Sequence, residues 1–243
     1  MKQFLRDYVI PPGILQLVYR VQDAREASRY SSTADDYDAA RYWQSHYRAS
    51  GPERLFSSAN QGLDDEENRR QYESARRLFE SMVADFRLPE HPRVLEIGFG
   101  TGFYTEVVHR LGFRDYLGVD ITDATIPGIL RRLDGFGGTL VRRDAGQERI
   151  ERRGCDLVYM IDVSQHIVND DKLVFCLREN VVPNLKPGGF FIVTDELSQR
   201  SKLFYEKTRT LEFYRDALAG CELFHEPIAF RDKYVFSFRR ARG

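Results

Sequence analysis

The segment from Val94 to Thr105 constrains the fold of this chain more than any other part of the sequence. It reads VLEIGFGTGFYT, an apolar strand followed by Gly98, Gly100 and Gly102 and then by the start of a helix. Glycines at this spacing allow positive φ angles and let a ligand approach the backbone closely. The turn also presents free N–H groups and the positive end of a helix dipole to an anionic group. The segment therefore predicts an α/β sheet with a ligand site at the carboxyl end of this strand.

The spacing of the glycines differs from the dinucleotide-binding pattern GxGxxG, because Phe103 stands where the third glycine of that pattern would be. The chain instead reads E-x-G-x-G-x-G, beginning at Glu96. A carboxylate beside the loop would repel a pyrophosphate and attract a cation. The pattern resembles the first motif of class I S-adenosylmethionine (SAM)-dependent methyltransferases, whose cofactor carries an ammonium, a sulfonium and one carboxylate. The resemblance implies SAM contacts by Glu96, Gly98, Gly100, Gly102 and Tyr104.

Two further apolar runs are followed by acids. Asp120 ends the run from Tyr116 and lies 22 residues after Gly98 (120 − 98). An acid at this distance sits at the end of the second strand and can accept hydrogen bonds from ribose hydroxyls. Residues 139–141 read as a third strand, and the resemblance implies that Asp144 after it bonds the adenine amino group. Taken singly, each acid is more typical of a strand-end turn, but taken together with Glu96 the two acids favour the cofactor interpretation. The cofactor contacts implied here are Asp120, Ile121, Asp144 and Ala145.

A fourth strand is predicted over residues 155–161, and the resemblance implies that Asp162 and Val163 after it line the cofactor site. His166 is the candidate catalytic residue, a general base at the carboxyl end of a strand. An amine acceptor has only to be neutral, whereas an alcohol acceptor needs such a base. The alternative is that His166 caps a helix or packs under the loop. His46 and the pair Asp195-Glu196 are reserve candidates.

The remaining pattern completes a doubly wound, Rossmann-like α/β fold. A helix over 68–87 precedes the first strand, and Lys-Pro-Gly-Gly at 186–189 predicts a turn before a strand at 190–194. A helix over 210–220 is followed by strands at 222–230 and 233–238. The family resemblance implies a seven-stranded, mostly parallel sheet whose last strand is antiparallel, with an N-terminal helical cap.

The N-terminal region is predicted to be a separate extension over residues 1–66, followed by the SAM-binding domain over 67–243. Residues 14–21 have an amphipathic helix pattern that would dock on the flank of the domain or, as the weaker alternative, lie on a membrane surface. The aromatic-rich segment over residues 37–48 resembles the cap of bacterial small-molecule and glycan-associated methyltransferases. Packing of the rings into the core is an equal alternative. The cap candidates are Tyr37, Tyr42, Trp43, His46 and Tyr47.

Composition excludes several other classes. The net charge is −1, so no overall positive field attracts nucleic acid. The 3 cysteines lack C-x-x-C spacing and are expected to be buried thiols in a reducing compartment. The 5 histidines show no metal-binding pair, so no metal is expected. No secretory signal and no apolar run of about 20 residues is found, which predicts a cytoplasmic protein.

These patterns predict a SAM-dependent methyltransferase that acts at oxygen on a small molecule or glycan. The alternatives are methylation of RNA or protein and a SAM-binding protein without catalysis. The sequence specifies neither the acceptor nor the oligomeric state.

Overall fold

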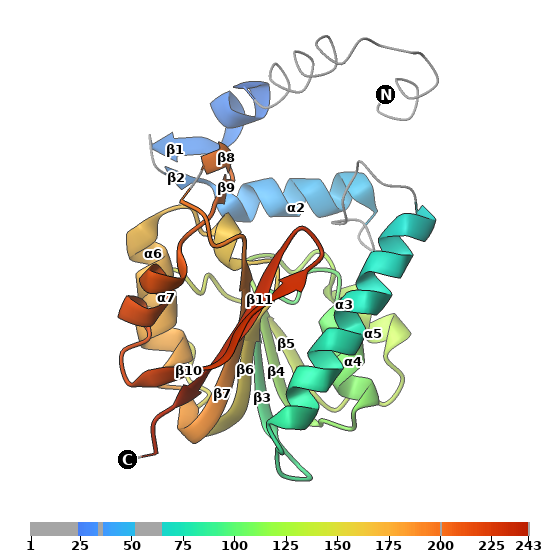
Figure 1. The fold of residues 1–243 in the computed structure, drawn as a ribbon. Coiled ribbons are helices and arrows are strands. Elements are labelled where there is room, and N and C mark those ends of the chain that lie inside the picture. Colours follow the sequence, from blue (N-terminus) through green and yellow to red (C-terminus); the bar gives the residue numbers. More distant parts are fainter. Residues whose placement is uncertain (1–23, 34–35, 52–64, 200, 243) are drawn as a thin grey trace.

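The computed structural model describes residues 24–33, 36–51, 65–199 and 201–242 of the chain. Its centre is a seven-stranded sheet with the order β10-β11-β7-β6-β3-β4-β5 (Figure 1). Strand β11 is antiparallel to both of its neighbours, and β7, β6, β3, β4 and β5 are parallel to one another. The predicted sheet, with its antiparallel last strand, is confirmed. The strands are β3 (Arg93–Ile97), β4 (Asp115–Asp120), β5 (Thr139–Arg142), β6 (Cys155–Met160), β7 (Leu185–Asp195), β10 (Cys221–Phe230) and β11 (Lys233–Arg240).

Helices cover both faces of this sheet, which explains why its central strands are buried and mostly apolar. All six residues of β6 are buried, as are four of the five in β3. On one face, α3 (Asp65–Asp85), α4 (Phe103–Arg110) and α5 (Ile126–Arg132) pack against strand residues such as Leu157. On the other face lie α6 (Asp170–Phe175), the π-helical turn η2 (Cys176–Val181) and α7 (Leu211–Ala217), which contact Val158 and Phe191.

Two local predictions need correction. The Lys-Pro-Gly-Gly segment does not precede the fifth strand but lies inside β7 as an irregularity. Cys155 pairs with Leu185 whereas Leu157 pairs with Phe190, so β7 has extra residues opposite β6. Gly188 makes this possible with a φ angle of 78°. The second correction is a short hairpin after β7, formed by β8 (Ser201–Leu203) and β9 (Glu206–Lys207), that no sequence pattern predicted.

The order of the strands determines where a ligand can bind. The chain runs outward from β3 through β4 to β5 and then returns to β6 on the other side of β3. The carboxyl ends of β3 and β6 therefore flank a topological switch point, where open α/β sheets bind ligands. Figure 1 shows α2 (Ala39–Ser50) lying across this edge of the sheet, after the short strands β1 (Ser31–Thr33) and β2 (Asp36–Tyr37). The helix predicted at 14–21 falls outside the described residues.

Candidate cofactor and acceptor site

The glycine loop after β3 has the backbone that its sequence predicts. Gly98, Gly100 and Gly102 have φ angles of 80°, 50° and 85°. A Cβ atom at Gly98 would lie 2.2 Å from Val163, and one at Gly102 would lie 2.6 Å from Ile129. These two glycines are therefore required by packing within the fold. At Gly100 the nearest atom to such a Cβ is the hydroxyl oxygen of Tyr47 at 3.2 Å, so this position faces the helix α2.

Asp120 connects the end of β4 to this loop. Its Oδ2 accepts a hydrogen bond from the Gly100 N–H at 2.9 Å, and its Oδ1 accepts one from the Thr122 N–H at 3.0 Å. Burial raises the pKa of the Asp120 carboxyl to about 6, so it is ionised at neutral pH. A carboxylate has about four acceptor positions. Two bonds of Asp120 are made within the protein, and the remaining capacity suits hydroxyl donors such as those of ribose.

Glu96 has a different environment from the one predicted at the mouth of the loop. Its side chain is buried, and its Oε2 accepts hydrogen bonds from Thr105 at 2.8 Å, from Tyr159 at 2.9 Å and from the hydroxyl of Tyr116. Burial raises the pKa of Glu96 to about 7. The carboxyl is thus only partly ionised at neutral pH, which weakens its predicted repulsion of a pyrophosphate. It holds β3, β4, β6 and α4 together, and direct contact of Glu96 with the cofactor stays a prediction.

The buried Glu96 should make the stability of the protein depend on pH. Its folded-state pKa of about 7 exceeds the ordinary value of 4.5, so the folded state holds the extra proton between these values. The free energy of unfolding should therefore fall as pH rises through this window, by up to about 1.4 kcal/mol per pH unit. Urea unfolding of Glu96→Gln should lack this slope, whereas the exposed control Glu90→Gln should keep it. An equal slope in both variants would contradict this assignment.

The acid after β5 behaves as a turn former. Asp144 accepts a hydrogen bond from the Gly146 N–H at 2.9 Å, and its backbone carbonyl accepts from the next turn of the chain. Ala145 is buried and its carbonyl accepts from the Asn180 side chain at 2.8 Å. These contacts support the turn interpretation of Asp144, and its bond to adenine stays a prediction. The Ile121 carbonyl accepts from Arg142 at 3.1 Å, beside Asp120.

The acid after β6 is paired with two cations that sequence patterns did not indicate. Asp162 has a positive φ of 60° and forms ion pairs with Arg231, in the turn between β10 and β11, and with Lys233, the first residue of β11. The Lys233 ammonium lies 3.1 Å from Asp162 Oδ1, and burial lowers the pKa of this lysine. The turn of the last hairpin therefore reaches the switch point. Tyr104, in contrast, is buried in α4 with its ring 5.2 Å from that of Phe79.

Helix α2 contacts three of the loops at the carboxyl edge. Gln44 accepts a hydrogen bond from the Thr122 hydroxyl after β4, and Tyr47 lies against Gly100 after β3. The Tyr37 hydroxyl, just before α2, donates to the His166 carbonyl at 2.9 Å after β6. Asp38 caps the helix by accepting from the Arg41 N–H at 3.0 Å. The helix thus lies over the switch point, as a cap would.

The aromatic residues of this segment divide between packing and site contacts. Tyr42 is buried, and its ring stacks on Tyr205 at 4.8 Å and meets Trp43 edge-on at 5.2 Å. His46 lies next to Trp43, with ring centroids 5.3 Å apart. The Trp43 N–H donates to the Tyr37 hydroxyl at 3.0 Å. The packing interpretation therefore fits Tyr42, while Tyr37, Trp43 and Tyr47 also contact the loops at the carboxyl edge.

His166 lies in the 3₁₀ turn η1 (Ser164–His166), directly after β6. Its Nδ1 is 3.0 Å from the Tyr205 carbonyl oxygen. Because a carbonyl only accepts, Nδ1 carries the proton and Nε2 has the lone pair. Burial lowers the pKa of His166 to about 3, which keeps the ring neutral. The Trp43 ring meets it edge-on at 4.8 Å, which places this imidazole beneath the cap.

The central part of the chain matches a known protein family. Residues 94–189, from β3 into β7, match the family model described as a methyltransferase domain. The predicted methyltransferase domain is confirmed over these residues, and the resemblance to class I SAM-dependent methyltransferases is supported by solved structures of the same fold. No curated protein matches it.

Solved structures share the fold of this methyltransferase at low sequence identity. The magnesium protoporphyrin IX methyltransferase of Synechocystis PCC 6803, solved with bound SAM, is 14% identical with a TM-score of 0.63, over 86% of this chain and 100% of its own. A SAM-dependent methyltransferase from Clostridium acetobutylicum is 16% identical with a TM-score of 0.61, over 77% and 96% of the two chains. The amino pentose methyltransferase CalS10 of Micromonospora echinaspora is 16% identical with a TM-score of 0.56, over 70% and 92%.

The residues of this methyltransferase fit SAM as its cofactor. Gly100 keeps open a gap between the loop and Tyr47 that a side chain would fill. Asp120 is an ionised acceptor with capacity for two hydroxyl donors, and aromatic rings from α2 lie across the same edge. Rings near a sulfonium contribute cation–π attraction of about 1 kcal/mol. When bound, SAM supplies a methyl group activated by the positively charged sulfur.

Replacing Asp120 by asparagine should weaken SAM binding by about 1.5–3 kcal/mol, since each charge-assisted bond contributes about this much. In the unsubstituted protein, SAM affinity should decline as pH falls through about 6, because the Asp120 carboxylate is then protonated. Calorimetric titration at several pH values measures both effects. Asp123→Asn, the same charge change at an exposed position of the same loop, serves as the control. An unchanged dissociation constant in Asp120→Asn would remove this residue from the site.

Two other findings concern metals and membranes. Within residues 24–33, 36–51, 65–199 and 201–242, no group of three His, Cys, Asp or Glu side chains is placed to hold a metal ion. In the same described part of the chain, no helix has both the length and the apolar character needed to cross a membrane. Cys155 and Cys176 are buried free thiols, as expected, whereas Cys221 is a free thiol that is only partly buried.

Proposed function

We propose that this methyltransferase transfers the methyl group of SAM to an oxygen atom of a small molecule or glycan. The observation that carries the proposal is the neutral imidazole of His166 after β6, with its Nδ1 proton bonded to the Tyr205 carbonyl. Its Nε2 lone pair is then free of a proton at physiological pH. The neutral imidazole, whose Nε2 lies 3.4 Å from the Gln165 amide nitrogen, can accept the proton of a hydroxyl acceptor. Because its pKa of about 3 makes it a weak base, its contribution should lie at the lower end of the usual range of about 10²–10⁴-fold.

The other contribution of the chain is alignment. Methyl transfer is an in-line displacement, and holding the reacting groups in line is worth about 7–11 kcal/mol in good cases. Asp120 and the glycine loop would orient the cofactor from one side of the switch point. Helix α2, which contacts the loops after β3, β4 and β6, would exclude water from the other side. This supports assigning residues 1–66 to a cap and residues 67–243 to the SAM-binding domain.

Small-molecule acceptors are supported by the solved structures of the same fold, whose names include amino pentose and magnesium protoporphyrin methyltransferases. Three of the arginine pairs in the sequence, at 131–132, 142–143 and 152–153, do not favour RNA. In each pair one member is bound to an acid, as Arg132 is to Glu106, Arg143 to Glu148 and Arg152 to Asp115. These charges are compensated locally.

Turnover of labelled SAM with a panel of hydroxyl-bearing small molecules, glycans, RNA and proteins tests the proposal. We expect S-adenosylhomocysteine to form together with a methylated hydroxyl compound that mass spectrometry identifies. Methylation confined to RNA, with affinity that falls steeply with salt, would favour the macromolecular alternative. SAM binding without turnover on any acceptor would favour a non-catalytic protein.

A further inference from the structure

The guanidinium of Arg209 is a buried positive charge in the described part of this site, and neither the sequence pattern nor the proposed function uses it. Its side chain is only 3% exposed. The residue lies between the hairpin β8–β9 and α7, and its backbone N–H donates to the Asp195 carboxylate at the end of β7. Tyr214 donates to the same carboxylate at 2.6 Å. Arg209 is therefore held firmly at the carboxyl edge of the sheet.

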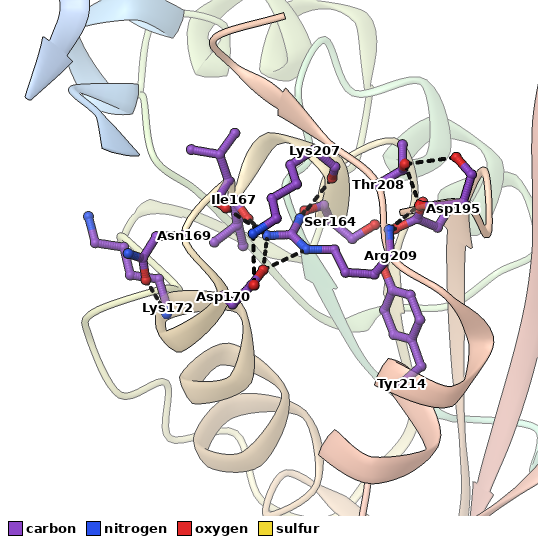
Figure 2. Close-up of polar contacts among 12 residues, drawn as sticks. Ser164, Ile167, Asn169, Asp170, Lys172, Asp195, Lys207, Thr208, Arg209 and Tyr214 are labelled. Atoms are coloured by element: carbon purple, nitrogen blue, oxygen red, sulfur yellow. Dashed lines mark hydrogen bonds and ion pairs between the residues drawn. The ribbon is translucent and has the colours of Figure 1, made fainter. Parts of the chain in front are cut away.

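The Nη1 and Nη2 groups of this guanidinium donate to backbone carbonyls of two separate segments (Figure 2). The first segment is the loop after β6, where the carbonyls of Ser164, Ile167 and Val168 accept at 3.2, 2.7 and 2.9 Å. The second is the hairpin β8–β9, where the Lys207 carbonyl accepts at 2.8 Å. Arg209 thus joins the loop after β6 to the hairpin.

One carboxylate balances the buried charge. Asp170, the first residue of α6, accepts from Arg209 Nη2 at 2.9 Å and from Nε at 3.1 Å. Its other oxygen accepts from the Lys207 ammonium at 2.7 Å. The planar fork of arginine can serve acceptors in several directions at once, whereas a lysine ammonium is a compact point charge with three donors.

The loop after β6 and the β8–β9 hairpin are joined by a second contact, the hydrogen bond of His166. This residue lies between Ser164 and Ile167, whose carbonyls are both bound to Arg209. Its Nδ1 donates to the carbonyl of Tyr205, two residues before Lys207. The position of the hairpin relative to the loop therefore determines whether His166 keeps this hydrogen bond. The hydrogen bond in turn determines which ring nitrogen carries the proton.

We propose that Arg209 is a positioning residue that fixes the orientation and tautomer of His166 by joining the loop after β6 to the β8–β9 hairpin. The inference rests on the proposed role of His166 as the base. Arg209 itself touches no reacting atom. Arg209 acts by fixing the distance between the backbone of residues 164–167 and the Tyr205 carbonyl, which accepts the hydrogen bond from His166.

The test is a double-mutant cycle with Arg209→Lys and His166→Ala. Arg209→Lys should lower kcat by about 10–100-fold, since a displacement of about 1 Å at a reacting group costs this much. SAM affinity should change by less than about twofold. In the His166→Ala background, Arg209→Lys should have no further effect on kcat. Equal losses in both backgrounds would show a general structural role and overturn the proposal. Arg178→Lys, which replaces an exposed arginine that also bonds a carbonyl, is the control.

The tautomer of His166 gives a readout that is independent of activity. The ¹⁵N NMR signals of the imidazole should show a proton on Nδ1 in the unsubstituted protein and a mixture of tautomers in Arg209→Lys. An unchanged tautomer would contradict the proposal. Full turnover by His166→Ala would instead refute the proposed base, and the NMR result would still decide the role of Arg209. If Arg209→Lys gives no cooperative unfolding transition, Asp170→Asn replaces it and should shift the same signals in the same direction.

Discussion

Replacing Gly100 by valine is expected to abolish detectable SAM binding while the sheet remains folded. Gly100 has a φ of 50°, a region that a β-branched residue enters only with strain. A Cβ atom there would lie 3.2 Å from the Tyr47 hydroxyl, so the valine methyl groups would fill the gap between the loop and the cap. Calorimetric titration with SAM measures the effect, and thermal unfolding confirms that the variant is folded.

A matched control separates strain from the loss of the site. Gly135 also has a positive φ, of 65°, but a Cβ atom there would meet nothing within 4 Å. Gly135→Val therefore carries a similar backbone strain outside the crevice and should keep its affinity for SAM. If Gly100→Val bound SAM as the unsubstituted chain does, the glycine loop would not be the cofactor site.

Replacing His166 by alanine should lower turnover by about 10²-fold, the lower end of the usual contribution of a positioned base, because the low pKa of His166 makes it a weak base. SAM affinity should change by less than about twofold, because no contact assigned to the cofactor involves the imidazole. Single-turnover kinetics and calorimetry measure the two quantities. His225→Ala, on the edge strand β10, removes a histidine that bonds Ser237 at 2.9 Å and should retain full turnover.

The pH profile provides a second check on His166. Because burial lowers its pKa to about 3, the ring is neutral above that value. At saturating SAM and acceptor, turnover should therefore stay level as pH falls from about 8 to about 5. A histidine base with an ordinary pKa of about 6.5 would lose most of its activity over this range. Loss of turnover centred near that value would show that His166 is not held in the buried, neutral state.

The main features of this fold could be predicted from sequence because they depend on local patterns. The glycine turn after β3 needs positive φ angles, and the acid that ends β4 follows at the distance that the first two strands impose. The predicted α3 begins within three residues of its observed start, since its apolar residues recur at helical spacing. Each of these signals lies within one short segment of the chain.

The features that sequence could not supply depend on contacts between distant segments. Arg209 holds residues about 40 positions away, and no spacing in the sequence links them. Lys233 and Arg231 reach Asp162 only because β11 is inserted next to β7 in the sheet. The alternation of side chains along β3 places Glu96 on the face covered by α3 and α4, where its partners Thr105, Tyr116 and Tyr159 come from other segments, and its contact with the cofactor stays a prediction.

The most direct test of the account is calorimetric titration of the unsubstituted chain with SAM and, separately, with NAD. The structure and the family assignment predict saturable binding of one SAM per chain and no measurable heat from NAD. Saturable binding of NAD, with none of SAM, would contradict the assignment of the Gly98–Gly102 loop and Asp120 to a methyl donor.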